Sequence, residues 1–231
     1  MTKISIIIPI LNEAKNIAKL INYLQESSSK KNIKDIIIVD GGSTDESIFI
    51  VSTFKEVLLV HSEKGRAKQM NLGAKHATGN ILYFLHADSF PPKDFDTYII
   101  NEVEKGHWAG CFKLKFDSSH WWLKLMGWFT KFSWPICRGG DQSLFITKHL
   151  FKDIGGFDES YIIYEDNIII KKLYKVKQFV VIQKDIITSA RLYEKHGVWK
   201  LQYHYLIIHL KHFFGASSET LYKYYAKNIK S

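Results

Sequence analysis

The chain has 231 residues, of which 46% are hydrophobic, and this content is typical of a folded domain and excludes a disordered chain. Its formal net charge is +9, but the lysines and arginines are scattered and form no basic arm, so no nucleic-acid partner is predicted. The two cysteines, Cys111 and Cys137, have neither a metal-binding spacing nor a disulfide framework, which favours a reducing compartment.

The start of the chain and its apolar runs bear on localisation. A strand is predicted from Ile4 onward, so we expect neither a signal peptide nor a targeting presequence. No apolar run approaches the roughly 20 residues that a membrane-spanning helix needs. The sequence therefore predicts a cytoplasmic protein.

Strands and helices alternate in the first half of the chain. Buried apolar runs predict strands over residues 4–8, 36–39, 57–60 and 81–88. Helices are predicted between them, over residues 17–24, 45–54 and 65–77. Asn12 is the predicted N-cap of the first helix. This order is typical of a parallel sheet with right-handed crossovers, and so of an α/β fold.

The second half has a different pattern. It predicts a half-exposed strand over residues 108–116, where Lys113 and Lys115 share one face, and an aromatic-rich helix over residues 120–132. A strand over 143–146 and a helix over 168–174 follow. No linker or repeat separates the halves, so we expect one domain over residues 1–231, with a change of character near residue 90.

Acidic residues follow three of the predicted strands. Glu13, Asp40 and Asp88 come at or just after the ends of the first, second and fourth strands. Ligands of open α/β sheets bind in the crevice beyond the strand C-termini, so these side chains outline one site. Their chemistry suits a nucleotide and a metal ion.

Several motifs carry a resemblance to a known family. The chain resembles a family-2 glycosyltransferase of the GT-A fold, and more narrowly a compact subfamily without transmembrane segments, over roughly residues 3–200. The matching segments are 6–13 (IIIPILNE), 39–45 (VDGGSTD), 86–88 (HAD), 165–166 (ED), 65–71 (GRAKQMN), 140–142 (GDQ) and 196–199 (HGVW). The resemblance implies a Rossmann-like, mostly parallel nucleotide-binding half over about residues 1–90. A mixed acceptor-binding half with C-terminal helices is implied for about residues 91–231.

The resemblance also implies a divalent cation, Mn²⁺ or Mg²⁺, which neutralises the leaving diphosphate as a Lewis acid. The family motif is Asp-any-Asp, whereas this chain has His86-Ala87-Asp88 and so lacks the first carboxylate. Asp88 is the expected metal contact. The alternative is that Asp88 only caps the turn before Pro91.

The donor site follows from the same resemblance. Asp40 is expected to accept the N3 hydrogen of uracil, with Pro9, Leu11 and Glu13 around the base and ribose. For Glu13, a favourable first-turn position in the following helix is an equal alternative. Arg66 and Gln69 are expected to face the nucleotide from the third helix, and Arg66 is favoured because a guanidinium pairs well with phosphate.

The reaction itself needs a base. In the family, the Asp of the Glu165-Asp166 pair removes the proton of the attacking acceptor hydroxyl, so Asp166 is the expected catalytic base. The alternative is a helix N-terminal acid without a catalytic role. Asp141 and Gln142 are expected to form the acceptor-side wall of the sugar pocket.

A C-terminal segment completes the expected site. Arg191 is predicted to bind phosphate, and His196 either to ligate the metal or to donate to phosphate. We expect residues 189–199 to be a loop that orders over the donor. The alternative for His196 is a cap on the helix that begins near Val198.

The sequence therefore predicts an inverting, metal-dependent glycosyltransferase that uses a nucleotide-sugar, most readily a UDP-sugar, and an unidentified acceptor. The alternatives are a nucleotidyltransferase and an inactive nucleotide-sugar-binding or membrane scaffold. Residues 120–129 and 203–214 mix aromatics with lysine, which favours peripheral contact with an anionic membrane at the inner face of the cell membrane and a lipid-linked acceptor. Completion of the core or a dimer contact is the alternative, and the oligomeric state stays open.

Overall fold

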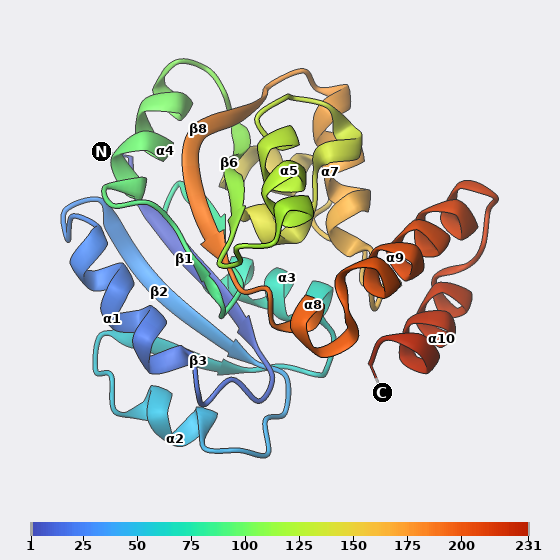
Figure 1. Ribbon diagram of the computed structural model, residues 1–231. Helices are drawn as coiled ribbons and strands as arrows, with labels where there is room; N and C mark the ends of the chain where they lie inside the picture. Colours follow the sequence, from blue (N-terminus) through green and yellow to red (C-terminus); the bar gives the residue numbers. More distant parts are fainter. Residues whose placement is uncertain (1, 231) are drawn as a thin grey trace.

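The computed structural model describes residues 2–230. Its strands form an eight-stranded sheet in the order β3-β2-β1-β4-β7-β6-β8-β5 (Figure 1). The strands are β1 (Ile4–Ile10), β2 (Ile33–Asp40), β3 (Val57–His61), β4 (Ile81–Phe84), β5 (Ser89–Phe90), β6 (Ala109–Phe116), β7 (Leu144–Thr147) and β8 (Phe179–Thr188). The first four are mutually parallel, and β7 pairs antiparallel with both β4 and β6.

Helices cover both faces of this sheet. On one face lie α1 (Ile17–Ser27), α2 (Ser47–Ser52), α4 (Phe95–Glu104) and α5 (Trp121–Phe129). On the other face lie α3 (Arg66–His76), α6 (Lys148–Asp153) and α7 (Glu165–Lys175). The C-terminal helices are α8 (Arg191–His196), α9 (Val198–Phe213) and α10 (Ser218–Asn228), and two short 3₁₀ turns are η1 (Pro135–Cys137) and η2 (Gly140–Gln142).

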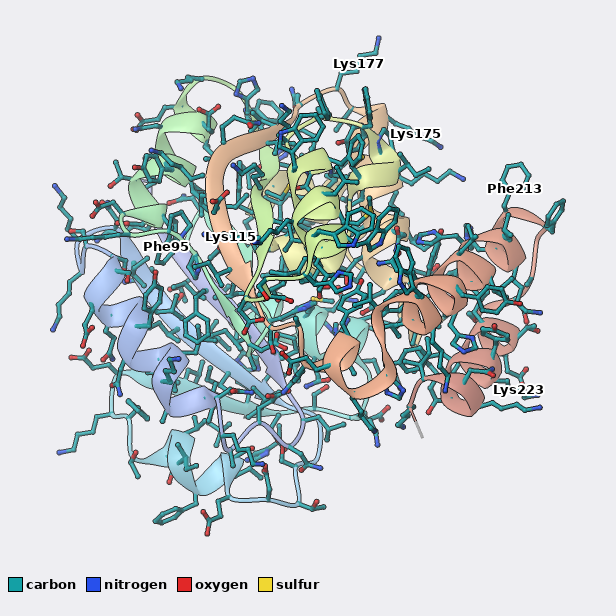
Figure 2. All side chains as sticks on the ribbon, viewed as in Figure 1. Phe95, Lys115, Lys175, Lys177, Phe213 and Lys223 are labelled. Carbon is teal, nitrogen blue, oxygen red and sulfur yellow. The ribbon has the colours of Figure 1, made fainter. Side chains whose placement is uncertain are left out.

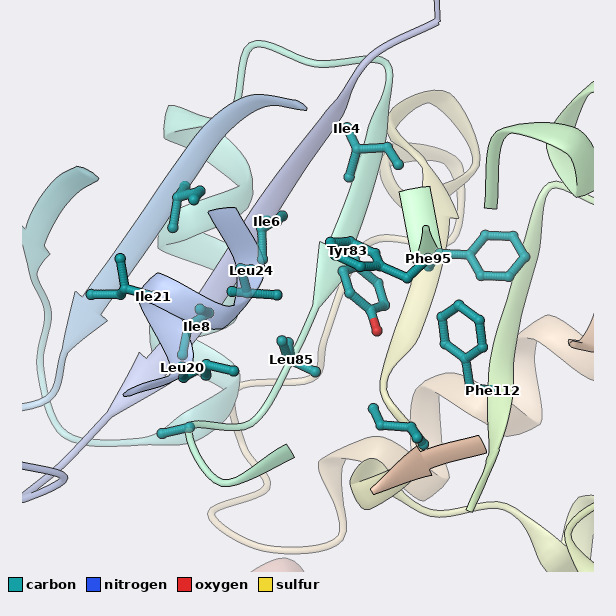
Figure 3. Close-up of a cluster of buried hydrophobic side chains, with 14 of the residues drawn as sticks. Ile4, Ile6, Ile8, Leu20, Ile21, Leu24, Tyr83, Leu85, Phe95 and Phe112 are labelled. Atoms are coloured by element: carbon teal, nitrogen blue, oxygen red, sulfur yellow. The ribbon is translucent and has the colours of Figure 1, made fainter. Parts of the chain in front are cut away.

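The two-residue period of β1 explains the two cores. Ile4, Ile6 and Ile8 point into the α1 side, where they pack with the apolar face of that helix (Figure 3). Ile7 points to the opposite side, against α3. Both sets are fully buried because a central parallel strand is covered on both faces. The α/β class predicted from the sequence is confirmed.

Two predictions for the segment between β1 and α1, on Asn12 and on Glu13, differ from the structure. Asn12 is not the N-cap of α1, which begins at Ile17 after Asn16. Asn12 instead adopts a positive φ of 58°, and its side chain accepts a hydrogen bond from the Thr44 N–H. Glu13 likewise precedes the first turn of α1, so the interpretation of Glu13 as a first-turn helix acid is wrong.

Two further boundaries differ from prediction. The fourth strand ends at Phe84 rather than Asp88, so residues 85–88 form a turn that leads into β5. Residues 191–196 form the helix α8 rather than a loop. The sequence also did not predict α4, α6, α10 or β8. In β8 a polar segment, residues 183–185, divides two apolar runs, and the pairing with β6 shifts register there.

The C-terminal helices α9 and α10 form a hairpin that projects to the side of the sheet away from α1 and α2 (Figure 1). The hairpin has a small core of its own, built on Leu201, Ile208, Leu221 and Ile229. Within residues 2–230, none of the helices combines the length and the apolar content that crossing a membrane requires.

Candidate active site

The C-terminal ends of β1, β2 and β4 lie side by side, and the loops after β1 and β2 are joined. The Asn12 N–H donates to the Ser43 hydroxyl at 2.9 Å, and the Thr44 N–H donates to the side-chain Oδ1 of Asn12 at 2.8 Å. Pro9, in register with Val39, and Leu11 are half-buried along the same edge. These two loops therefore form one wall of the predicted crevice.

Asp40 organises the loop after β2. Its carboxylate accepts hydrogen bonds from the N–H groups of Gly42 at 2.9 Å and Ser43 at 3.1 Å. Only 2% of the residue is exposed, and His61 lies 3.7 Å away. A carboxylate has about four lone-pair sites, so these contacts leave acceptor capacity for a ligand.

Gln69 lies behind the wall rather than in the crevice. Its side-chain amide donates to the carbonyl oxygens of Ile10 at 2.8 Å and Val39 at 2.7 Å, and the residue is 5% exposed. The amide thus ties the ends of β1 and β2 together. This placement corrects the prediction that Gln69 faces the nucleotide, because both of its donors are used inside the protein.

Arg191, the first residue of α8, bridges two of the strand-end acids. Its guanidinium makes a two-pronged contact with Glu13, at 2.6 and 3.1 Å, and lies 3.2 Å from the Asp88 carboxylate. Burial raises the pKa of Asp88, although the charges of His86 and Arg191 oppose that rise. A fork geometry of this kind is the one that recognises carboxylate or phosphate.

A second cation, Arg66, stands at the start of α3 and faces the start of α7. Its guanidinium is 3.3 Å from Glu165 and 3.8 Å from Asp166. Glu165 is 1% exposed, and burial together with the neighbouring Asp166 charge raises its pKa to about 7, against the opposing charge of Arg66. Asp166 is more accessible, with 14% of its side chain exposed, so it is the acid of the pair that a ligand can reach.

His86 links this acid pair to the η2 turn. Its Nδ1 lies 3.3 Å from the Asp141 carboxylate. Burial and the Arg66 charge lower the pKa of His86, but the hydrogen bond and charge of Asp141, with Asp166, outweigh them and raise it. Gly140 packs so closely that a Cβ there would collide with the Asp166 carboxylate and lie 3.0 Å from the His86 ring. His86, Gly140, Asp141 and Asp166 therefore form one compact cluster.

Gln142 is placed differently from its prediction. It is 3% exposed, and its amide accepts from Arg138 and donates to the Cys137 carbonyl. Gln142 therefore supports the η2 turn, because both ends of its amide are bonded inside the protein. Arg138 is a residue that sequence reasoning missed. Its guanidinium also donates to the carbonyls of Thr130 and Phe132, and the residue is 5% exposed. The signal available in the sequence was an arginine directly before two glycines.

The C-terminal helices bring aromatic residues to the same cluster. The nearby Asp141 charge, after burial, helps to raise the pKa values of Tyr193 and Tyr205. The sequence named neither tyrosine for the site, although Tyr193 lies within the predicted segment 189–199, and Tyr205 follows the last motif. Both tyrosines lie within reach of the Asp141 charge.

Few side chains of the candidate site could hold a metal ion. Within residues 2–230, three or more His, Cys, Asp or Glu side chains do not gather into a metal-binding group. Asp88 offers one carboxylate as a ligand. Mg²⁺ commonly binds through one or two carboxylates plus substrate phosphates, so Asp88 fits a cation that arrives together with the nucleotide-sugar.

His196 ends α8 and is half-buried, and within the described chain its Nε2 has no hydrogen-bond partner. Its interpretation as the cap of α9 is wrong, because Gly197 occupies that position without a side-chain hydrogen bond. Its role in metal or phosphate binding stays a prediction.

Comparison with known proteins agrees with this geometry. The model of the family described as Glycosyl transferase family 2 matches residues 5–157, which is more than half of the chain. The chain is 33% identical over 94 residues to glycosyltransferase AglE of Haloferax volcanii, covering 38% of this chain and 31% of that protein. It is 30% identical over 100 residues to poly(ribitol-phosphate) beta-N-acetylglucosaminyltransferase TarS of Staphylococcus aureus, covering 41% of this chain and 18% of that protein.

Solved structures show the same fold. TarS residues 1–349 in complex with UDP superpose with a TM-score of 0.67 at 20% identity, covering 82% of this chain and 61% of that one. The mannosyltransferase PcManGT of Pyrobaculum calidifontis, in complex with GDP-Man and Mn²⁺, gives 0.64 at 20% identity, covering 89% and 62%. These likenesses confirm the GT-A fold. The chain spans less than a third of the length of the two curated relatives above.

Proposed function

The chain belongs to glycosyl transferase family 2, and we propose that it is an active glycosyltransferase that moves a sugar from a UDP-sugar to an acceptor hydroxyl with inversion. The observation that carries this proposal is the position of Asp166. It is an accessible acid, held between Arg66 and the Gly140 turn, in the same cluster as His86 and Asp141. TarS, similar in fold, has been solved with UDP and with UDP-GlcNAc.

In this proposal the uracil lies at the joined loops after β1 and β2. Asp40 accepts the N3 hydrogen with its remaining lone pairs, while its loop contacts hold the carboxylate in place. Pro9 and Leu11 supply the apolar edge against which the base packs. Gln69 acts from behind, because it fixes the two strand ends that carry these residues.

The diphosphate lies next to Arg191. Without donor, Arg191 neutralises Glu13 and Asp88, and phosphate oxygens compete for the same guanidinium when the donor binds. Glu13 then becomes free to contact the ribose. A divalent cation held by Asp88, with His196 as a second candidate ligand, would supply Lewis-acid stabilisation of the leaving diphosphate.

Asp166 performs the proton transfer. As the acceptor oxygen forms its bond to the anomeric carbon, its proton passes to Asp166, and the bond from that carbon to the diphosphate oxygen breaks. The electron pair leaves with UDP. One carboxylate is sufficient for this single displacement, and Arg66 holds it in position through its contacts with both acids of α7.

Asp166→Asn tests this assignment. The amide is nearly isosteric but cannot take the proton, so turnover should fall about a hundredfold or more while UDP affinity stays near that of the native protein. Sugar transfer or donor hydrolysis is measured as UDP release, and affinity by calorimetry.

The matched control is Asp158→Asn, at a half-buried acid of the loop before α7 whose side chain accepts hydrogen bonds only within its own turn. Native turnover in Asp166→Asn would remove this residue as the base. Release of pyrophosphate from UTP and a sugar 1-phosphate, with no release of UDP from a UDP-sugar, would identify a nucleotidyltransferase instead.

A further inference from the structure

An exposed apolar surface lies on α5, η1 and α9, outside the site described above. We call it the aromatic face. Its members are large hydrophobic side chains that remain at least two-fifths exposed, namely Trp121, Trp128, Trp134, Ile136, Trp199, Tyr203, Leu206, Leu210 and Phe213. Isolated exposed apolar residues are ordinary, whereas a contiguous set of this size marks an interaction surface.

The α9 part of this face is a regular helical stripe. Trp199, Tyr203, Leu206, Leu210 and Phe213 recur every three or four residues, so they share one side of the helix. The other side of α9 already packs, through Leu201 and Ile208, in the hairpin core with α10. The stripe is therefore what remains after the helix has completed its intramolecular contacts.

The α5 and α9 parts are continuous. The Trp199 ring lies 6.0 Å from that of Trp121 and 5.1 Å from that of Trp122, measured between ring centroids. A cavity of about 340 Å³ opens at this junction, lined in part by Leu123, Tyr193 and Val198. Since Tyr193 belongs to α8, the aromatic face adjoins the helix whose first residue, Arg191, contacts the site.

The charged side chains in the chain segments that carry the aromatic face are all positive. Residues 118–140 and 195–218 contain no Asp or Glu. Lys124 and Lys200 are exposed, and the Lys131 ammonium lies 3.7 Å from the centre of the Trp128 ring. Lysine beside tryptophan is the composition of helices that lie in the interface of anionic membranes.

We propose that the aromatic face binds the surface of an anionic lipid bilayer. Binding to a bilayer does not depend on the proposed function. Only the role we give to that binding, which is to hold the site beside a lipid-linked acceptor, rests on it. The tip of the hairpin fits this partner, because Phe213 and Phe214 are each 80% exposed and Phe213 points away from the body of the protein (Figure 2).

A second copy of the chain fits the surface less well. A two-fold dimer interface places the same patch of both copies together. Here that would bring the lysines of the two patches together, with no acidic residue in either segment to neutralise them. Anionic head groups neutralise those lysines while the acyl region receives the aromatic rings.

Vesicle flotation tests the proposal with the full chain. The native protein should float with vesicles that mix phosphatidylcholine and phosphatidylglycerol, and bind vesicles of phosphatidylcholine alone more weakly. Leu206→Gln with Phe213→Gln should lower partition about tenfold or more, because both side chains leave the acyl region. Lys200→Ala should lower it about fivefold at low salt.

Phe49→Gln is the matched control, because Phe49 is 71% exposed on α2, which lies away from α9 (Figure 1). This variant should bind vesicles as the native protein does. UDP affinity, measured by calorimetry, reports folding and the donor site separately from vesicle binding. Absence of flotation of the native protein would overturn the proposal. A second outcome would also overturn it. In that outcome the native protein sediments as a dimer, and Leu206→Gln with Phe213→Gln converts it to a monomer without changing vesicle partition.

Discussion

At the scale of single residues, Gly140 shows how closely the groups around Asp166 are packed. It has an ordinary backbone conformation, so its lack of a side chain matters for space rather than for φ. A methyl group there would press on the Asp166 carboxylate and on His86. The glycine of the sequence motif GDQ is thus required by the space that Asp166 occupies, 26 positions away in the chain. No local sequence pattern indicates this contact.

Gly140→Ala should therefore lower turnover about a hundredfold, because a displacement of about 1 Å in a catalytic group has an effect of that size. UDP affinity should change far less. Steady-state kinetics and calorimetry measure the two quantities. Gly139→Ala is the control, since no atom approaches the position of its Cβ and its φ of −162° is open to any residue. Equal turnover in the two variants would show that Asp166 is not confined in this way.

Glu165 contributes a pH dependence of stability. Its pKa is raised from near 4.5 to about 7 in the folded protein, so the folded chain keeps a proton that the unfolded chain has lost. The free energy of unfolding that this group supplies is full below pH 4.5 and falls as the pH rises through 7. Arg66 limits the loss, because it pairs with the ionised form.

Glu165→Gln removes this ionisation. We expect the decline in the free energy of unfolding between pH 4.5 and 7.5 to become smaller by on the order of 2 kcal/mol, as urea unfolding at several pH values would show. Glu104→Gln, at an exposed position of α4, should leave the decline unchanged. A steeper decline in Glu165→Gln than in the native protein would contradict the raised pKa.

At the scale of elements, α8 joins parts of the chain that are remote in sequence. It places Arg191 against Glu13, after β1, and Asp88, after β4. Both acids carry negative charge into the place where the proposed function puts the diphosphate, and Arg191 compensates them. Because α8 is only six residues long, its position depends on these contacts and on packing against α9.

Arg191→Ala should weaken UDP binding by about tenfold to a hundredfold in the presence of a chelator, because a charged, forked contact is lost and two acids are left uncompensated. Addition of Mn²⁺ should recover part of the affinity through Asp88. Calorimetry with and without Mn²⁺ measures both effects, and Lys200→Ala, on the exposed side of α9, should behave as the native protein. Unchanged affinity in chelator would exclude Arg191 from the phosphate site.

At the scale of the whole molecule, the candidate site lies at the junction of two kinds of sheet. Asp40 is the last residue of the parallel strand β2, and Glu13 and Asp88 lie in the turns that follow the parallel strands β1 and β4. The antiparallel strand β7 then connects this half to β6 and β8, and the chain before β7 supplies Asp141. The acidic residues of the candidate site thus come from both halves of the chain, and the proposed function assigns the first half to the donor and the second to the acceptor.

The sequence by itself determined the α/β class, the parallel first half, the position of Asp40 at a strand end and the positions of Arg66 and Asp166 at helix starts, whereas Asp88 lies in the turn after β4. These features follow from local periodicity, in which side chains alternate along a strand and recur every three or four residues along a helix. Strand ends of a parallel sheet meet at one edge, so the outline of the site follows from chain order alone.

Only the tertiary structure decided which polar groups face the crevice. Gln69 and Gln142 belong to site motifs, yet both point into the protein because carbonyls and Arg138 satisfy their amides there. The tertiary structure also joined Arg191 to Glu13 across 178 positions and His86 to Asp141. A local pattern fixes the side of an element on which a residue lies, but its hydrogen-bond partner depends on which distant backbone groups burial leaves unpaired.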